Sequence, residues 1–127
     1  PITHPGAKYS GPNPGTTIIP VGFKKEPDCR AFEHETVFER DIEIPLRDGT
    51  IIRADVFRPA DMSSVPAIVH YSPYGKSGAG TSMNMRLAPG RVGIPRSALS
   101  GFQCFEAFDP AEWVLHGYAV INVDARG

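Results

Sequence analysis

Apolar residues occupy every second position in two neighbouring stretches of the chain. The first stretch contains Phe38, Ile42, Ile44 and Leu46, and the second contains Ile52, Ala54 and Val56. A period of two is typical of half-buried β-strands, in which alternate side chains face the core. Asp48 and Gly49 lie between the stretches, and this dipeptide favours a tight hairpin turn. The pattern therefore predicts an antiparallel hairpin.

Two short and mostly apolar runs follow, at residues 66–72 and 118–124. Runs of this length suit strands that are covered on both faces. Between them, Asp109, Pro110 and Glu112 stand where the N-cap, N1 and N3 residues of a capping box would be, and Gly117 is placed to end the helix. A strand, a helix and a strand in this order predict a parallel crossover unit. We therefore predict an α/β fold, in which the hairpin leads into a mixed, mostly parallel sheet.

The first part of the chain has a different character, because Pro and Gly recur every few positions. We interpret residues 1–36 as an extended arm and residues 37–127 as the start of a folded domain. Residues 16–21 are the strand-like part of the arm. We expect the arm to lie over its own chain, and a disordered tail is the alternative. A second long segment, residues 74–101, is rich in Gly, Ser and Met and is predicted to be a functional or flexible loop.

Composition and charge narrow the classes of function. An apolar fraction of 41% indicates a globular chain, and a net charge of −1 gives no reason to expect a nucleic-acid or membrane partner. The sequence shows no membrane-span or signal-peptide pattern, so a cytoplasmic location is predicted. Cys29 and Cys104 match no metal or redox spacing. We expect free thiols, with one long-range disulfide as the alternative, and no metal or cofactor.

Candidate chemistry gathers at the predicted strand ends, where open α/β sheets place their ligands and catalytic groups. One end carries SPYGK at 72–76 and another carries DARG at 124–127. Together with RDGT at 47–50, ADVFRP at 54–59 and GYAV at 117–120, these motifs resemble the CocE/NonD hydrolase family. That family includes cocaine-esterase-like enzymes, α-amino-acid ester hydrolases and S15-type X-Pro dipeptidyl peptidases. The resemblance covers residues 37–127.

The resemblance implies the N-terminal part of an α/β-hydrolase fold and a role for Tyr74. In that family the tyrosine of this segment donates its hydroxyl to the oxyanion hole, which stabilises the charge that develops during acyl transfer. Without the resemblance, Tyr74 would be interpreted as a strand-end aromatic residue. Gly75, Lys76 and Phe105 are the candidate substrate-binding residues. Arg126 is expected to pair with a carboxylate beneath the site.

The nucleophile of that family is not found in these 127 residues. It occupies a Gly-x-Ser-x-Gly elbow, and an acid and a histidine follow it in the chain. The nearest match, GTSMN at 80–84, lacks the closing glycine. We therefore expect a longer serine hydrolase that acts on a small-molecule ester or amide through an acyl-enzyme. The 127 residues alone are expected to be inactive.

Two other functions stay open. The same fold could serve a non-hydrolytic step, such as cyclase or lyase chemistry, and a missing serine in the full-length sequence would favour this. Alternatively, the chain could be a non-catalytic interaction fragment that forms a homo-oligomer through residues 1–36. Nucleotide binding is not expected, because His70 stands where a P-loop ahead of Gly75 and Lys76 needs glycine. His70 is interpreted as a strand residue.

Overall fold

The computed structural model describes residues 11–76, 94–104 and 106–126. Within these ranges it contains one five-stranded sheet of order β1-β2-β3-β5-β4, in which β4 and β5 are parallel and the other neighbours are antiparallel. The mixed sheet of an α/β fold is thus confirmed, although β4–β5 is the one parallel pair among the described strands. The elements are β1 (Gly15–Ile19), β2 (Thr36–Pro45), β3 (Ile51–Pro59), β4 (Ala67–Tyr71), the 3-10 helix η1 (Arg96–Ala98), α2 (Pro110–Leu115) and β5 (Ala119–Val123).

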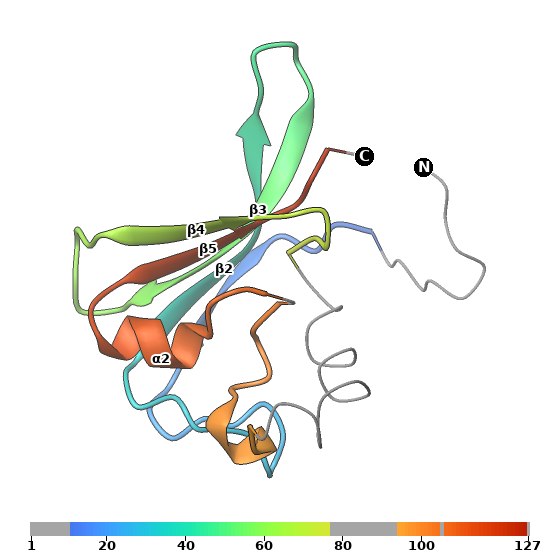
Figure 1. Cartoon of the computed structure of the whole chain (residues 1–127). Helices are drawn as coiled ribbons and strands as arrows, with labels where there is room; N and C mark the ends of the chain where they lie inside the picture. The colour runs from blue at the N-terminus through green and yellow to red at the C-terminus, as the bar shows by residue number, and fades with distance from the viewer. Residues whose placement is uncertain (1–10, 77–93, 105, 127) are drawn as a thin grey trace.

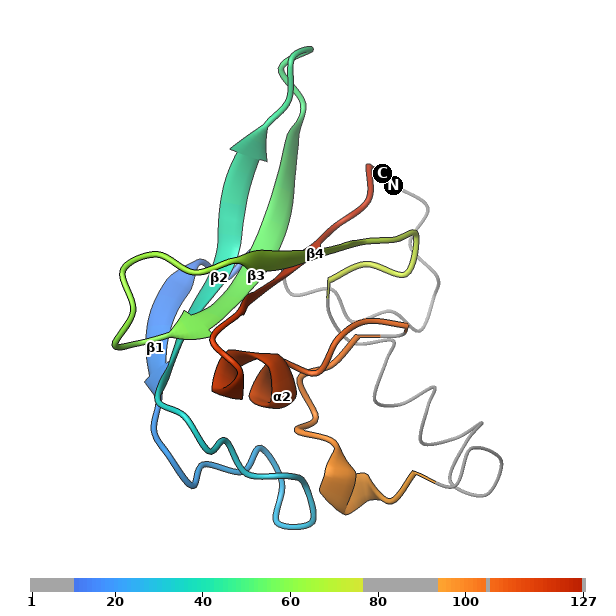
Figure 2. The same ribbon diagram turned by 60° about the vertical axis from the view of Figure 1, so that its left-hand side comes forward.

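The hairpin prediction is confirmed, because β2 and β3 pair through a turn in which Gly49 adopts a φ of 83°. The hairpin tip projects well beyond the rest of the sheet (Figure 2). The regular alternation predicted for the first strand is wrong at one point. A β-bulge lies between Glu39 and Ile42, so Arg40 and Asp41 together face one residue of β3. Phe38 and Ile42 therefore lie on opposite faces of the sheet.

The crossover helix begins and ends as predicted. The carboxylate of Asp109 accepts the main-chain N–H of Ala111 at 3.0 Å, and Gly117 follows the helix with a φ of 79°. Glu112, expected to complete a capping box, instead binds Arg30 with its carboxylate and lies 3.0 Å from Nε2 of His116. Helix α2 packs beneath one face of the sheet (Figure 1).

The core lies on the face of the sheet that α2 covers. Phe38, Phe57 and Val120 are register partners across β2, β3 and β5, and we call them the apolar row. The rings of Phe38 and Phe57 stack at a centroid distance of 4.2 Å. Phe102 packs edge-on against both rings and so belongs to the same core.

The described part of the arm lies over its own chain, as expected. Strand β1 pairs antiparallel with β2. The chain then turns back beneath the sheet, where Phe32 exchanges main-chain hydrogen bonds with Gly22 and Phe23. Ile19 and Phe32 are buried in the same cluster as Val120. This part of the arm therefore contributes core residues to the sheet domain.

Strand β4 differs from its prediction. A strand covered on both faces was expected, but Val69 and Tyr71 are 59% and 60% exposed. Both lie on the face opposite α2, because alternate residues of a strand point to opposite sides. Within the described ranges β4 is also an edge strand. The helices of these ranges are too short or too polar to cross a membrane.

Candidate active site

Tyr74 lies in a tight turn that directly follows β4. The main-chain N–H of Gly75 approaches the carbonyl oxygen of Ser72 at 3.4 Å, and the N–H of Tyr74 approaches the Ser72 hydroxyl at 3.3 Å. The side chain of Tyr74 is 42% exposed. The turn therefore presents a phenol at the carboxyl end of a parallel strand, where α/β folds bind their ligands.

Gly75 and Asp124 bring the turn close to the end of β5. Gly75 has a φ of 77°, which L-residues with a side chain rarely adopt. A Cβ atom at this position would lie 3.3 Å from Oδ1 of Asp124. The same oxygen accepts the main-chain N–H of Lys76 at 2.8 Å. The turn thus needs a glycine at position 75 for both its backbone conformation and its approach to Asp124.

Lys76 is the next residue, and its ammonium, its carbonyl oxygen and its main-chain N–H each contact another part of the chain. Its ammonium lies 2.8 Å from Asp41 and 2.9 Å from Asp55, and its carbonyl oxygen accepts the thiol of Cys104 at 2.7 Å. Its main-chain N–H binds Asp124, as described above. The side chain is only 9% exposed. Sequence reasoning proposed Lys76 as a substrate contact, whereas the structure directs its ammonium into the protein.

The β-bulge of β2 supplies one of the two carboxylates. Asp41 has a φ of 53°, unusual for a residue with a side chain. Its N–H donates to Oδ1 of Asp55 at 3.0 Å, and its Oδ2 accepts the N–H of Asn13 at 2.5 Å. The bulge therefore turns Asp41 toward Asp55 and Lys76, and Asn13 connects the arm to the same group. We call Asp41, Asp55, Lys76 and Asp124 the polar cluster.

Two members of the polar cluster, Lys76 and Asp41, are held in their charged forms. Burial disfavours the ammonium of Lys76, but hydrogen bonds to Asp41 and Asp55 outweigh it and raise the pKa of Lys76. The hydrogen bond from Lys76 lowers the pKa of Asp41 against the effect of burial. Burial, followed by the charges of Asp55 and Asp124, raises the pKa of the Cys104 thiol to about 11. Cys104 is therefore a neutral thiol beside the charged pair of Lys76 and Asp41.

A row of polar residues runs parallel to the apolar row on the same face of the sheet. Asp55 pairs in register with Asn122, and Asn122 pairs with His70. Asn122 is fully buried, and its amide and Nδ1 of His70 have no hydrogen-bond partner among the described residues. We call Asp55, Asn122 and His70 the polar row. It runs from the polar cluster to the edge of β4.

Arg126 and the two cysteines are the other predicted residues that the structure describes. Arg126 pairs with a carboxylate, as expected, but the partner is the exposed Asp48 in the hairpin turn. Phe105, most of the long loop and residues 80–84 lie outside the described residues. Cys29 and Cys104 are both buried free thiols, in agreement with the prediction. The oxyanion role of Tyr74 and the substrate-binding roles of Gly75, Lys76 and Phe105 stay predictions.

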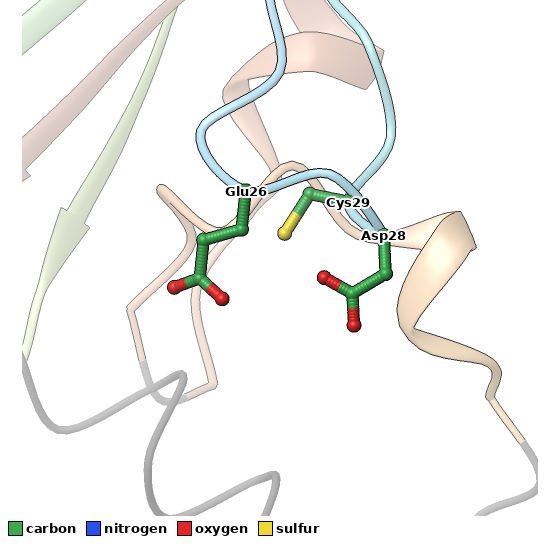
Figure 3. Close-up of side chains that lie close together, drawn as sticks. All are labelled: Glu26, Asp28 and Cys29. Carbon is green, nitrogen blue, oxygen red and sulfur yellow. The ribbon is translucent and has the colours of Figure 1, made fainter.

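Glu26, Asp28 and Cys29 form one group with metal-ligating side chains (Figure 3). Arg96 binds the carboxylate of Glu26, and its Nε lies 3.2 Å from the carboxylate of Asp28. Burial, followed by the charge of Asp28, raises the pKa of the Cys29 thiol and so disfavours a thiolate ligand. The guanidinium of Arg96 already pairs with both carboxylates. We therefore assign this group to the anchoring of η1.

Sequence reasoning missed two carboxylates of the polar cluster, those of Asp41 and Asp55. The apolar alternation of the first strand is interrupted at Arg40, next to Asp41, and Asp55 lies between Ala54 and Val56. Acidic residues inside buried strands are rare unless they are paired. That rarity was a usable signal for a buried cation, although it could not have identified Lys76 as the partner.

Several comparisons relate this chain to known proteins. L-tyrosine:2-oxoglutarate aminotransferase ucdG of Aspergillus ustus is 42% identical over 53 residues, which are 42% of this chain and 10% of that protein. Two crystal structures of a CocE/NonD family hydrolase from Staphylococcus aureus also match. One has a TM-score of 0.62 and 32% identity over 74% of this chain, and the other has a TM-score of 0.67 and 28% identity over 91%.

These matches cover only part of the longer proteins, since the chain spans 16% and 19% of the two hydrolase chains. They confirm the resemblance to the CocE/NonD hydrolases that the motifs indicated. The sequence profile described as X-Pro dipeptidyl-peptidase (S15 family) matches residues 48–127. This range is more than half of the chain and includes the hairpin turn, the Tyr74 turn and β5. The chain therefore belongs to the X-Pro dipeptidyl-peptidase (S15) family.

Proposed function

We propose that the protein containing this chain is a serine hydrolase that cleaves or transfers the acyl group of a small-molecule ester or amide. In this proposal the phenol of Tyr74 donates a hydrogen bond to the carbonyl oxygen that becomes negatively charged. The observation that carries the proposal is the position of Tyr74. It is half exposed at the carboxyl end of β4, in a turn that Gly75 and Asp124 hold in place.

The chemistry explains why a firmly held phenol suits this position. Attack of a serine on a carbonyl carbon moves charge to the carbonyl oxygen, and a donor already in place stabilises the transition state by about 3–4 kcal/mol. A second donor is expected from the main-chain N–H that follows the nucleophile. The serine, the acid and the histidine of the triad are expected in the full-length protein outside these 127 residues.

The proposal is tested by intact-mass spectrometry of the full-length protein before and after treatment with a fluorophosphonate. We expect a single adduct, located by peptide mapping to a serine in a Gly-x-Ser-x-Gly elbow, because an activated serine attacks this probe. A heat-denatured sample is the control and should carry no adduct. A folded protein that takes up no probe would contradict the proposal and favour the non-hydrolytic alternative.

A further inference from the structure

We propose that Lys76 is a positioning residue that sets the location of the Tyr74 hydroxyl. This inference rests on the proposed function, because it concerns the donor that Tyr74 provides there. Lys76 contacts neither the substrate nor the reacting atoms in this proposal. It acts by fastening the turn of residues 72–76 to three strands of the sheet.

The first support is the number of independent contacts that Lys76 makes. Its N–H binds Asp124 after β5, its carbonyl oxygen accepts the Cys104 thiol, and its ammonium binds both Asp41 in β2 and Asp55 in β3. Because Tyr74 is only two residues away, these contacts restrict the backbone that carries it. The hydrogen bonds within the turn itself are longer than these contacts, at 3.3 and 3.4 Å.

The second support is the rigidity of the elements that supply the carboxylates. Strand β3 lies between β2 and β5 in the sheet, so Asp55 comes from an interior strand. Asp41 is held in the bulge by its own N–H bond to Asp55 and by the N–H of Asn13. Lys76 therefore links the turn to two fixed points. Supporting groups of this kind keep a catalytic donor within the narrow range of productive geometry.

The third support comes from the cost of burying these charges. A buried ion pair contributes little net stability, and well-packed apolar residues of similar volume often serve as well. The apolar row on the same face shows that this sheet can build an apolar core. A lysine shared by two carboxylates adds defined directions and distances, which an apolar contact does not. Lys76 is two residues from Tyr74 in the same turn. Its fixed contacts therefore also restrict the position of the candidate oxyanion donor.

A double-mutant cycle in the full-length protein tests the inference. Lys76→Met should lower kcat by ~10- to 100-fold with a much smaller change in KM, because a displaced donor weakens mainly the transition state. In a Tyr74→Phe background the same substitution should lower kcat by less than about 3-fold, because the effects of substitutions at residues that act as one unit are not additive. Lys76→Arg, which keeps the cation, should recover part of the activity.

The matched control is Lys25→Met. Lys25 is exposed, but its ammonium also donates to an oxygen of a distant segment, the carbonyl of Gly101 at 2.8 Å, and the contacts of the polar cluster described above do not include it. It should leave kcat close to that of the wild type. If the Lys76 variants fail to fold, as judged by circular dichroism, the cycle is carried out with Asp55→Asn. This variant keeps the shape of Asp55 and removes one charge, and its kcat loss should also depend on Tyr74.

The outcomes separate this inference from the proposed function. If Tyr74→Phe slows the enzyme but the losses from the two substitutions simply multiply, Lys76 has only a structural role and the inference is overturned. Wild-type turnover in Lys76→Met would overturn it as well. If Tyr74→Phe itself turns over normally, the oxyanion assignment fails, and the inference fails with it.

Discussion

The apolar row and the polar row lie side by side on one face of the sheet, yet they have different consequences. Phe57 and Asp55 are two residues apart on β3, and Val120 and Asn122 are their register partners on β5. Phe57 and Val120 pack against α2 and the arm. Asp55 lies instead among the groups that surround Lys76. A step of two residues along the same strands therefore separates the contacts that hold the domain together from those that position the Tyr74 turn.

The comparison predicts that substitutions in the apolar row have the largest effect on stability. Phe57→Ala removes a ring that is 2% exposed and stacked on Phe38, so it should lower the free energy of unfolding by about 3–5 kcal/mol. Ile51→Ala, in an exposed position of the same strand, should cost less than about 1 kcal/mol. Urea unfolding of the full-length protein measures both, and equal losses would contradict the distinction.

A pair of glycine substitutions separates backbone strain from the polar cluster. Gly75 and Gly49 both have a positive φ, so replacement of either by alanine should cost about 1–2 kcal/mol. The new Cβ meets Asp124 only at position 75, and nothing lies within 4 Å at position 49. Gly75→Ala should therefore also lower kcat, whereas Gly49→Ala should not. Steady-state kinetics measure the kcat of both variants at a temperature where both are folded. An equal loss of kcat in the two variants would contradict this distinction.

The polar cluster should give stability a bounded pH dependence. The pKa of Asp41 is lowered, so its contribution is present above the ordinary value of 3.8 and is lost as the pH falls through the lowered value. The pKa of Lys76 is raised, so its contribution is complete below 10.5 and is lost as the pH rises through the raised value.

The difference in unfolding free energy between the wild type and Lys76→Met measures this contribution. It should be level around neutral pH and should shrink at both extremes. Urea titrations across the pH range provide the data. A difference that stayed constant into strong acid and strong alkali would show that the charges of Lys76 and Asp41 do not matter for stability.

The smallest predicted effect concerns the two thiols. Burial raises the pKa of both Cys29 and Cys104, and that of Cys104 reaches about 11. Because the thiolate is the reactive form, both should react slowly with a disulfide reagent in the folded protein and rapidly in urea. Lys76→Met removes a charge that lowers the pKa of the Cys104 thiol, so it should slow the reaction of Cys104 further and leave that of Cys29 unchanged. Equal acceleration at both cysteines would indicate general loosening.

Local patterns in the sequence predicted much of the fold. The alternation around Asp48 and Gly49, the cap residue Asp109 and the apolar run at 118–124 each depend on neighbouring residues, and the hairpin, α2 and β5 follow from them. The bulge at Asp41 was not predicted, because its position depends on how β2 pairs with another strand. The cover expected for β4 was inferred from composition alone, which does not say what packs against the strand.

The candidate site was harder to predict from residue patterns. Tyr74 was identified through its family resemblance, since a single tyrosine after a strand has no distinctive pattern. The polar cluster joins residues from position 41 to position 124, so only the folded topology brings them together. Asp55, between two apolar residues of its strand, was an unused signal that a cation lies near it. The choice of Lys76 over other cations depended on the turn that follows β4.

The kinetics of Tyr74→Phe test the central claim most directly, namely that Tyr74 is an oxyanion donor. In the full-length protein this substitution removes one hydroxyl and should lower kcat by ~10- to 1000-fold with little change in KM. Tyr71→Phe is the matched control, because Tyr71 lies three residues earlier on the exposed face of β4. It should turn over like the wild type. A Tyr74→Phe enzyme with near-normal kcat would contradict the claim.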